Sequence, residues 1–85
     1  MAEIEIYTSP FCGYCHRAKS LLGSKNADFK EIDVMMNSAL KSEMVERAGG
    51  RTSVPQIFIN GEHIGGSDDL AKLESEGQLD ALLAG

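Results

Sequence analysis

Residues 8–22 read TSPFCGYCHRAKSLL, and they contain both cysteines of the 85-residue chain, Cys12 and Cys15. Apolar residues recur at helical spacing after the second cysteine, which predicts a helix over residues 14–25. The preceding letters, EIEIYT, alternate between polar and apolar side chains and predict a strand that ends at Ser9-Pro10. The cysteines are therefore expected at the junction where a strand leads into a helix.

The spacing of the two cysteines suits a reversible redox pair. If the helix begins near Cys12, Cys15 lies one turn further on, and both sulfur atoms lie on the same side of the helix. Unpaired backbone N–H groups at a helix start favour a thiolate, so Cys12 should be the more acidic and more exposed thiol, and Cys15 the shielded one. A thiolate that attacks a disulfide leaves a mixed disulfide, which a second thiol nearby can resolve. The chain has no third cysteine to compete, so the pair predicts two-electron thiol-disulfide exchange.

Three other roles compete for the cysteines. A structural disulfide would close a very small loop and would stabilise the fold little. A zinc site needs four ligands, and only His16 and His63 could join the two thiols. The letters CGYCH also match the signature of c-type haem attachment, with Met35, Met36 or Met44 as a distal ligand, but such proteins mature outside the cytoplasm. Without a metal, His16 is expected to be an exposed residue of the first helical turn.

Composition and charge indicate one small globular domain over residues 1–85. The chain is 42% hydrophobic and 25% charged, and its length allows a single core. The net charge of −5, with no basic cluster, argues against nucleic acid or an anionic membrane as a partner. Glu3 and Glu5 occupy the region where a signal peptide carries basic residues, so we expect a cytoplasmic protein, in which permanent disulfides are rare.

The middle of the chain predicts a second strand and a second helix. The letters DFKEIDV at residues 28–34 alternate as a strand does. Asn37 or Ser38 could then cap a helix whose apolar residues recur at helical spacing, and Gly49-Gly50 should end it. Strand and helix therefore alternate through the first half of the chain.

The last third of the chain predicts a hairpin followed by two helices. In VPQIFINGEHIGG, residues 54–66, two apolar segments flank Asn60-Gly61, the dipeptide that best suits a type I′ turn. The letters SDDLAKLESEG, residues 67–77, predict a helix with Ser67 as its N-cap and two acidic residues in its first turn. A short closing helix, QLDALLA, is expected to pack its leucines on the sheet.

The chain resembles the glutaredoxins, specifically the small bacterial dithiol type, from its first strand to its last helix. The resemblance rests on IYT, CGYCHRAKSLL, SVPQIFINGEHIGG and SDDL, which stand in the family's order and at its spacing. It implies an α/β, thioredoxin-like fold with a four-stranded mixed sheet flanked by helices. It also implies a glutathione-disulfide oxidoreductase in which Cys12 attacks glutathionylated or disulfide-bonded proteins, Cys15 resolves protein disulfides, and glutathione is the co-substrate that regenerates the dithiol. We expect the protein to be a monomer.

The resemblance further implies a cis Pro55 that places the Val54 backbone beside Cys12. The chemistry of glutathione agrees, because the extended SVP segment can pair with the cysteinyl part of the tripeptide through the Val54 N–H and C=O. The bland alternative is a trans proline that begins a strand. Arg51 is the best candidate to bind the glycyl carboxylate, although a solvated loop arginine would look the same. Tyr14 either shields the mixed disulfide or covers the helix end.

The GGSDDL block, residues 65–70, is suited to bind the γ-glutamyl end of glutathione. Backbone N–H groups of Ser67 and Asp68 can hold the γ-glutamyl carboxylate at a helix start, while Asp68 or Asp69 meets the ammonium group. The alternative is plain N-capping of the helix. The expected glutathione-binding residues are Tyr14, Arg51, Ser53, Val54, Pro55, Gly66, Ser67, Asp68 and Asp69.

Two departures from the family pattern affect these expectations. Ser9 stands where many members have a lysine, and Gly13 stands where dithiol members usually have a proline. One alternative function is a hydrogen donor reduced by thioredoxin reductase, against which the GGSDDL block argues. The other is an iron-sulfur carrier or sensor, which Gly13 favours. In that case two chains would each supply Cys12, and two glutathiones would supply the remaining thiolates of a [2Fe-2S] cluster.

Overall fold

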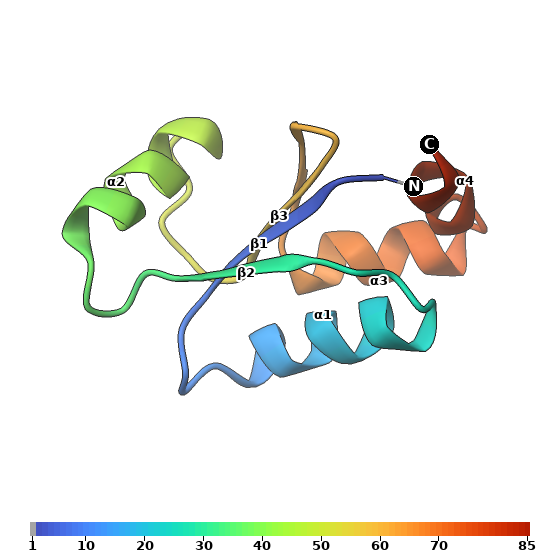
Figure 1. Cartoon of the computed structure of the whole chain (residues 1–85), viewed down its shortest axis with the longest axis horizontal. Coiled ribbons are helices and arrows are strands. Elements are labelled where there is room, and N and C mark those ends of the chain that lie inside the picture. Colours follow the sequence, from blue (N-terminus) through green and yellow to red (C-terminus); the bar gives the residue numbers. More distant parts are fainter. Residues whose placement is uncertain (1) are drawn as a thin grey trace.

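The computed structural model describes residues 2–85, which form a sheet with helices on both of its faces (Figure 1). The elements along the chain are β1 (Ile4–Thr8), α1 (Gly13–Ser24), β2 (Lys30–Asp33), α2 (Ser38–Arg47), β3 (Gln56–Ile59), β4 (Glu62–Gly65), α3 (Ser67–Ser75) and α4 (Leu79–Ala84). The strand and helix order predicted from the sequence is confirmed throughout. No helix among these residues is both long enough and apolar enough to cross a bilayer.

The sheet has four strands in the order β2-β1-β3-β4, and its pairing is mixed. β1 pairs in parallel with β2, and antiparallel with β3. Because parallel strands end at the same edge of a sheet, the segments after Thr8 and Asp33 emerge together there, and the Val34 N–H donates to the Thr8 carbonyl at 3.0 Å. The cysteines follow β1, so they lie at this edge.

The hairpin between β3 and β4 turns at Asn60-Gly61, as predicted. Asn60 has a φ of 52° and Gly61 a φ of 80°, the positive values that a type I′ turn requires at both central positions. The two strands are antiparallel, with Phe58 opposite His63. The register shifts between Ile57, which is opposite Gly65, and Phe58.

Each face of the sheet has its own apolar cluster, because strand side chains alternate between the two faces. One cluster joins the sheet to α1, α3 and α4 through buried residues Ile4, Ile6, Ala18, Leu22, Ile57, Ile59, Leu70 and Leu79. The other joins it to α2 through Tyr7, Val34, Met44, Ala48 and Phe58. Leu82 and Leu83 are partly buried against the first cluster, which confirms the predicted packing of the closing helix.

Arg47, at the end of α2, ties that helix to the sheet. Its guanidinium donates to both carboxylate oxygens of Glu5, at 2.9 and 3.3 Å, and to the Tyr7 hydroxyl at 2.8 Å. It also lies 4.1 Å from the centre of the Phe58 ring. The hydrogen bond to Arg47 lowers the pKa of Glu5, so the carboxylate is ionised at neutral pH.

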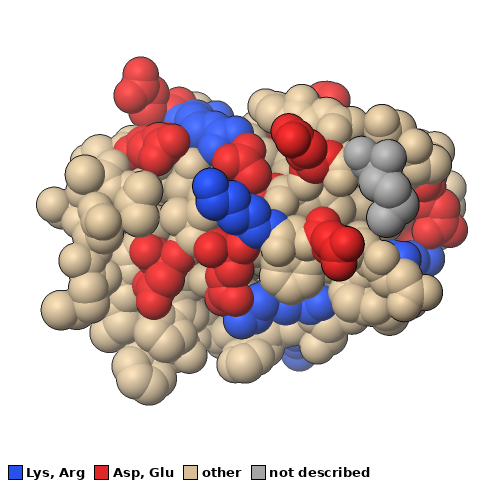
Figure 2. Space-filling model, in the orientation of Figure 1, with Lys and Arg blue, Asp and Glu red and all other residues tan. Residues whose placement is uncertain are grey.

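Charges of both signs are mixed on the face that Figure 2 shows, where Lys and Arg side chains lie beside Asp and Glu side chains. Ion pairs link several elements: Lys19 and Glu31 lie 2.9 Å apart between α1 and β2. Lys25 pairs with both Glu74 and Asp80, at 2.7 and 3.0 Å, and so links the end of α1 to α3 and α4.

Candidate active site

Cys12 is the N-cap of α1, so the helix begins near Cys12, as the redox prediction assumed, and one residue before the expected range of 14–25. Its backbone is extended, and its sulfur accepts a hydrogen bond from the Cys15 N–H at 3.2 Å. The dipole of α1 and this N–H both favour negative charge on the Cys12 sulfur. Both cysteines are free thiols. Cys12 is half-buried, whereas Cys15 is only 1% exposed, so a substrate can reach the first sulfur but not the second.

The surroundings of Cys15 keep its thiol protonated. Burial raises the pKa of Cys15 to about 12, and the hydrogen bond with Cys12 acts in the same direction. A negative charge on Cys12 would raise it as well, because two like charges close together oppose each other. Cys15 is therefore a protonated, buried thiol next to the accessible Cys12 sulfur.

The segment before β3 brings its backbone to Cys12. The Val54–Pro55 peptide bond is cis, as the family resemblance implied. The Val54 carbonyl accepts a hydrogen bond from the Cys12 thiol at 3.6 Å. The Val54 N–H donates to no group among residues 2–85. One polar group of Val54 thus meets the reactive sulfur, while the other is left for an incoming acceptor.

A cleft of about 280 Å³ lies beside this contact. Its wall comes from the start of α1, the segment before β3 and the start of α3. The lining residues are Tyr14, Arg51, Ser53, Val54, Pro55, Gly66, Ser67, Asp68 and Asp69. The structure therefore gathers every residue of the expected glutathione set around one hollow. Tyr14 is 58% exposed at the rim, with the Arg17 guanidinium 5.7 Å from its ring centre.

The start of α3 differs from the prediction in its cap. The N-cap is Gly66, and Ser67 is the first helical residue rather than the cap. The cause is Asp69, whose carboxylate accepts the Gly66 N–H at 2.9 Å from inside the first turn. Gly65 has a φ of 121°, and a Cβ there would collide with the Asp69 side chain, so only glycine allows this approach.

The two aspartates of this turn have different roles. The hydrogen bond from the Gly66 N–H lowers the pKa of Asp69, as does the Arg51 guanidinium, which donates to its carboxylate at 3.2 Å. The Asp69 carboxylate is therefore occupied by hydrogen bonds within the protein. Asp68 is exposed and makes no hydrogen bond or ion pair with residues 2–85, although it lines the cleft. Of the two candidates for the ammonium group, Asp68 is the one whose carboxylate is available.

Gln56 and His63 do not line the cleft but connect to it through Ser53; the sequence did not indicate Gln56, and it indicated His63 only as a possible zinc ligand. Gln56 is fully buried, and its amide nitrogen donates to the Ser53 carbonyl at 2.9 Å. Its amide oxygen lies 2.7 Å from Nε2 of His63. Burial lowers the pKa of His63, and the nearby positive charge of Arg51 does so too. The one sequence feature that could have indicated Gln56 is that it is the single polar residue of the otherwise apolar strand β3.

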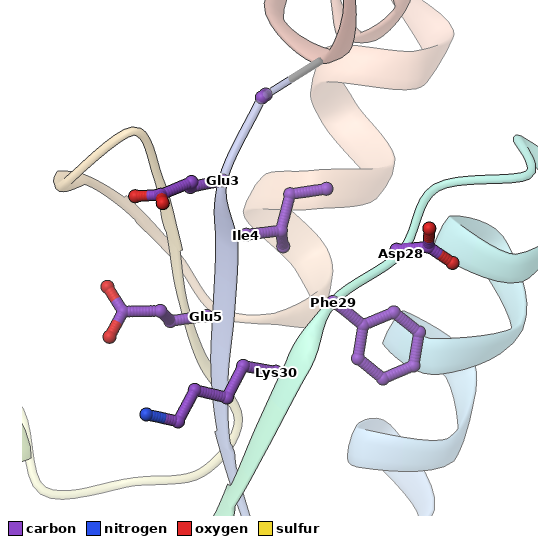
Figure 3. A pocket seen from close by; sticks show the side chains of 7 residues that line it. Glu3, Ile4, Glu5, Asp28, Phe29 and Lys30 are labelled. Atoms are coloured by element: carbon purple, nitrogen blue, oxygen red, sulfur yellow. The ribbon is translucent and has the colours of Figure 1, made fainter.

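A larger hollow, of about 550 Å³, lies at the opposite end of β1 (Figure 3). Its lining comes from the starts of β1 and β2. There Glu3, Glu5 and Lys30 point to one side of the sheet, while Ile4 and Phe29 point to the other (Figure 3). It contains neither cysteine. Size does not identify the site here, because the convergent polar groups and the reactive sulfur lie at the smaller cleft.

The metal-binding alternatives receive no support from side-chain positions. Among residues 2–85, no three His, Cys, Asp or Glu side chains gather closely enough to hold a metal ion. His16 is exposed on the first turn of α1, and His63 is held against Gln56. The arrangement instead provides an accessible thiol, a shielded thiol and an adjacent cleft with donors for carboxylates.

Comparison with known proteins gives one consistent result. The family model described as Glutaredoxin matches residues 4–64. Glutaredoxin 3 of Escherichia coli K12 is 55% identical over 83 residues, which are 98% of this chain and 99% of the relative. The solution structure of glutaredoxin from Brucella melitensis has a TM-score of 0.86 at 54% identity and covers 98% of this chain and 89% of its own. The crystal structure of a buckwheat glutaredoxin-glutathione complex has a TM-score of 0.89 at 28% identity, with coverages of 98% and 77%.

Proposed function

This chain belongs to the glutaredoxin family and is a glutathione-dependent thiol-disulfide oxidoreductase with a thioredoxin-like fold, and we propose which of its atoms perform each step. The observation that carries the proposal is the position of the Cys12 sulfur, between the start of α1 and the Val54 backbone at the edge of the cleft.

Cys12 is the nucleophile. Its thiolate attacks the glutathionyl sulfur of a glutathionylated protein, so that a bond forms between these two sulfurs and the bond to the protein sulfur breaks. The protein thiolate leaves and takes a proton from water. The Cys15 N–H, 3.2 Å from the Cys12 sulfur, stabilises the thiolate before the attack. A second glutathione thiolate then attacks the bound glutathionyl sulfur, releases glutathione disulfide and restores the Cys12 thiolate.

Cys15 completes the reduction of a protein disulfide. Cys12 first forms a mixed disulfide with one substrate sulfur, and the other substrate sulfur leaves. The Cys12 sulfur then carries no charge, so one cause of the raised pKa of Cys15 is removed and Cys15 ionises more readily. Its thiolate attacks the Cys12 sulfur, which gives the Cys12–Cys15 disulfide and frees the substrate dithiol. Two glutathiones reduce that disulfide and leave as glutathione disulfide.

Glutathione is proposed to lie along the cleft as a short added strand. The Val54 N–H has no partner among residues 2–85, which supports its pairing with the cysteinyl part. The γ-glutamyl carboxylate would meet the N–H groups of Ser67 and Asp68, because the first turn of a helix has no internal acceptors for them. The Asp68 carboxylate would bind the ammonium group. Arg51 keeps donors beyond the one that Asp69 accepts, which supports its role at the glycyl carboxylate.

Two assays run in parallel test these roles. Reduction of a glutathionylated peptide and of a protein disulfide would each be coupled to glutathione with its reductase, and separately to thioredoxin reductase. We expect Cys12→Ser to lose both activities and Cys15→Ser to keep only deglutathionylation. Equal loss in the two variants would contradict the assignment, and faster turnover with thioredoxin reductase would reassign the electron donor.

A cluster-binding role is a second proposal, which Gly13 supports. Gly13 is exposed beside Cys12, and apart from its chain neighbours and the backbone of its own helix, no atom of residues 2–85 lies within 4 Å of the place where its Cβ would be. One chain does not fit a [2Fe-2S] cluster, because it offers a single accessible thiol, so two chains and two glutathiones would be needed. Anaerobic reconstitution with iron, sulfide and glutathione should give a coloured dimer from the native chain and less from Gly13→Pro. A colourless monomer, or equal yields, would refute this role.

The remaining partners are proposed from the same chemistry. Glutathionylated and disulfide-bonded proteins are the substrates that an accessible thiol with a shielded partner can serve. The protein would work as a monomer in the cytoplasm, where glutathione keeps thiols reduced. Gel filtration of the reduced protein, with and without glutathione, tests the oligomeric state.

A further inference from the structure

A chain of hydrogen bonds runs from β4 to the wall of the cleft. The Gln56 amide nitrogen donates to the Ser53 carbonyl at 2.9 Å and lies 3.4 Å from the Ser53 hydroxyl. Because this nitrogen faces two oxygens, the Gln56 amide oxygen must face His63, and Nε2 of His63 must carry the proton. The chain therefore has one direction, from His63 through Gln56 to Ser53.

Burial and ring packing fix this chain in place. Gln56 is 0% exposed, so no water replaces either of its partners. The His63 ring packs against Phe58, with ring centres 5.0 Å apart. Phe58 and His63 are directly opposite in the β3–β4 pairing, and Gln56 lies two residues earlier on the same face of β3. Both side chains are thus held by paired strands, on either side of the register shift between Ile57 and Phe58.

The peptide bond between Ser53 and Val54 connects these hydrogen bonds to the cleft, because fixing the Ser53 C=O also fixes the direction of the Val54 N–H. A trans peptide unit is planar, and its C=O and N–H point in opposite directions. The cis bond in this segment is the next one, between Val54 and Pro55. Since Gln56 holds the Ser53 carbonyl toward the protein interior, the Val54 N–H must point the other way, toward the cleft that Ser53 and Val54 line.

We propose that Gln56 and His63 are positioning residues for glutathione: they hold the Ser53–Val54 peptide plane so that the Val54 N–H faces the incoming tripeptide. Neither side chain lines the cleft, so neither touches glutathione or the reacting sulfurs. Their effect should therefore fall on binding of glutathione and not on the sulfur chemistry. This inference rests on the proposed glutathione site.

Steady-state kinetics on four variants tests the proposal. Gln56→Met keeps the volume and removes the amide, while His63→Phe keeps a ring on Phe58 and removes the N–H donor. We expect the KM for glutathione to rise about three- to ten-fold in each, with kcat within about two-fold, as for loss of one hydrogen-bond constraint. His63→Gln restores a donor at the reach of Nε2 and should return KM to within about two-fold of the native value.

Ile59→Val is the matched structural control. It lies on β3 and is 3% exposed, but it belongs to the apolar cluster on the other face. It should lower the Tm and leave KM unchanged. An unchanged KM in Gln56→Met, an equal rise in Ile59→Val, or no recovery in His63→Gln would overturn the proposal. If Gln56→Met does not fold, the His63 pair decides.

Amide NMR separates this inference from the proposed function. On titration with S-methylglutathione, the Val54 amide resonance should shift strongly in the native protein and much less in His63→Phe at the same concentration. Strong native shifts that persist in His63→Phe would refute the positioning role alone. A native protein with no shifts around the cleft would refute the proposed glutathione site itself.

Discussion

At the scale of single residues, the surroundings of Cys15 determine how readily its thiol ionises. Burial and the hydrogen bond with Cys12 raise the pKa of Cys15 from its ordinary value near 9 to about 12. Between these values the folded Cys15 stays protonated while an unfolded chain would ionise, so this contribution to stability is complete below pH 9 and is lost as the pH rises toward 12. Cys15 should therefore be unreactive at neutral pH for two reasons, protonation and burial.

Alkylation tests this difference. With iodoacetamide at pH 7 and at pH 9, the folded reduced protein should be labelled at Cys12 well before Cys15. In urea both cysteines should react at similar rates, which serves as the control. Peptide mapping by mass spectrometry gives the order, and comparable labelling of both residues in the folded protein at pH 9 would contradict it.

Asp68 and Asp69 form a matched pair of variants. Asp68→Ala should raise the KM for glutathione by about ten-fold or more, since a charge-assisted contact contributes about 1.5 to 3 kcal/mol, and should leave the Tm nearly unchanged. Asp69→Ala removes the acceptor of the Gly66 N–H and should destabilise the fold by about 1 kcal/mol. Kinetics and thermal unfolding on both variants check this, and a Tm loss in Asp68→Ala without a KM change would assign that residue to capping instead.

Local patterns were sufficient to predict the secondary-structure elements. The Asn60-Gly61 turn, a cap of α2 at Asn37 or Ser38 and a start of α1 near Cys12 each depend on a few neighbouring residues. The structure confirms the turn and has Asn37 and Cys12 as the two caps. The predicted cap of α3, Ser67, was wrong because the observed cap depends on the Asp69 carboxylate accepting the Gly66 N–H, an approach that Gly65 allows. The nine expected cleft residues do lie together, but that placement came from family resemblance rather than from periodicity.

Contacts between distant elements could not be predicted from local patterns. Arg47 and Glu5 are 42 positions apart, and nothing near either residue indicates the other. Gln56 and His63 are on adjacent strands, but their hydrogen bond requires the register of the hairpin, including its irregularity. Local sequence patterns therefore predict helices, strands and some of the caps, whereas hydrogen bonds between distant side chains depend on how the elements pack.

Arg47 provides a prediction about how α2 is held on the sheet. Arg47→Met should lower the free energy of unfolding by about 1 to 2 kcal/mol, because hydrogen bonds to Glu5 and Tyr7 are lost together. Lys19→Met is the control: its partner Glu31 is 42% exposed, so the change should stay within about 0.5 kcal/mol. Urea unfolding measures both. Equal effects in the two variants would show that the α2 contact has no special weight.

At the scale of the whole molecule, the fold brings three chain segments to one place. The cysteine loop follows β1, the Arg51–Pro55 segment precedes β3, and the start of α3 follows β4. The sheet supports all three, and its two apolar faces fix the helices that carry the donors. A reaction that needs a thiolate, an extended partner and a carboxylate site can therefore occur within one small chain.

Trapping the glutathione intermediate tests the central claim most directly. Cys15→Ser protein, mixed with glutathione disulfide and quenched in acid, should gain one glutathione per chain, and peptide mapping should locate it on Cys12. Added glutathione should release it as glutathione disulfide, and Cys12→Ser should gain none. An adduct absent from Cys12, or one that glutathione does not release, would contradict the account.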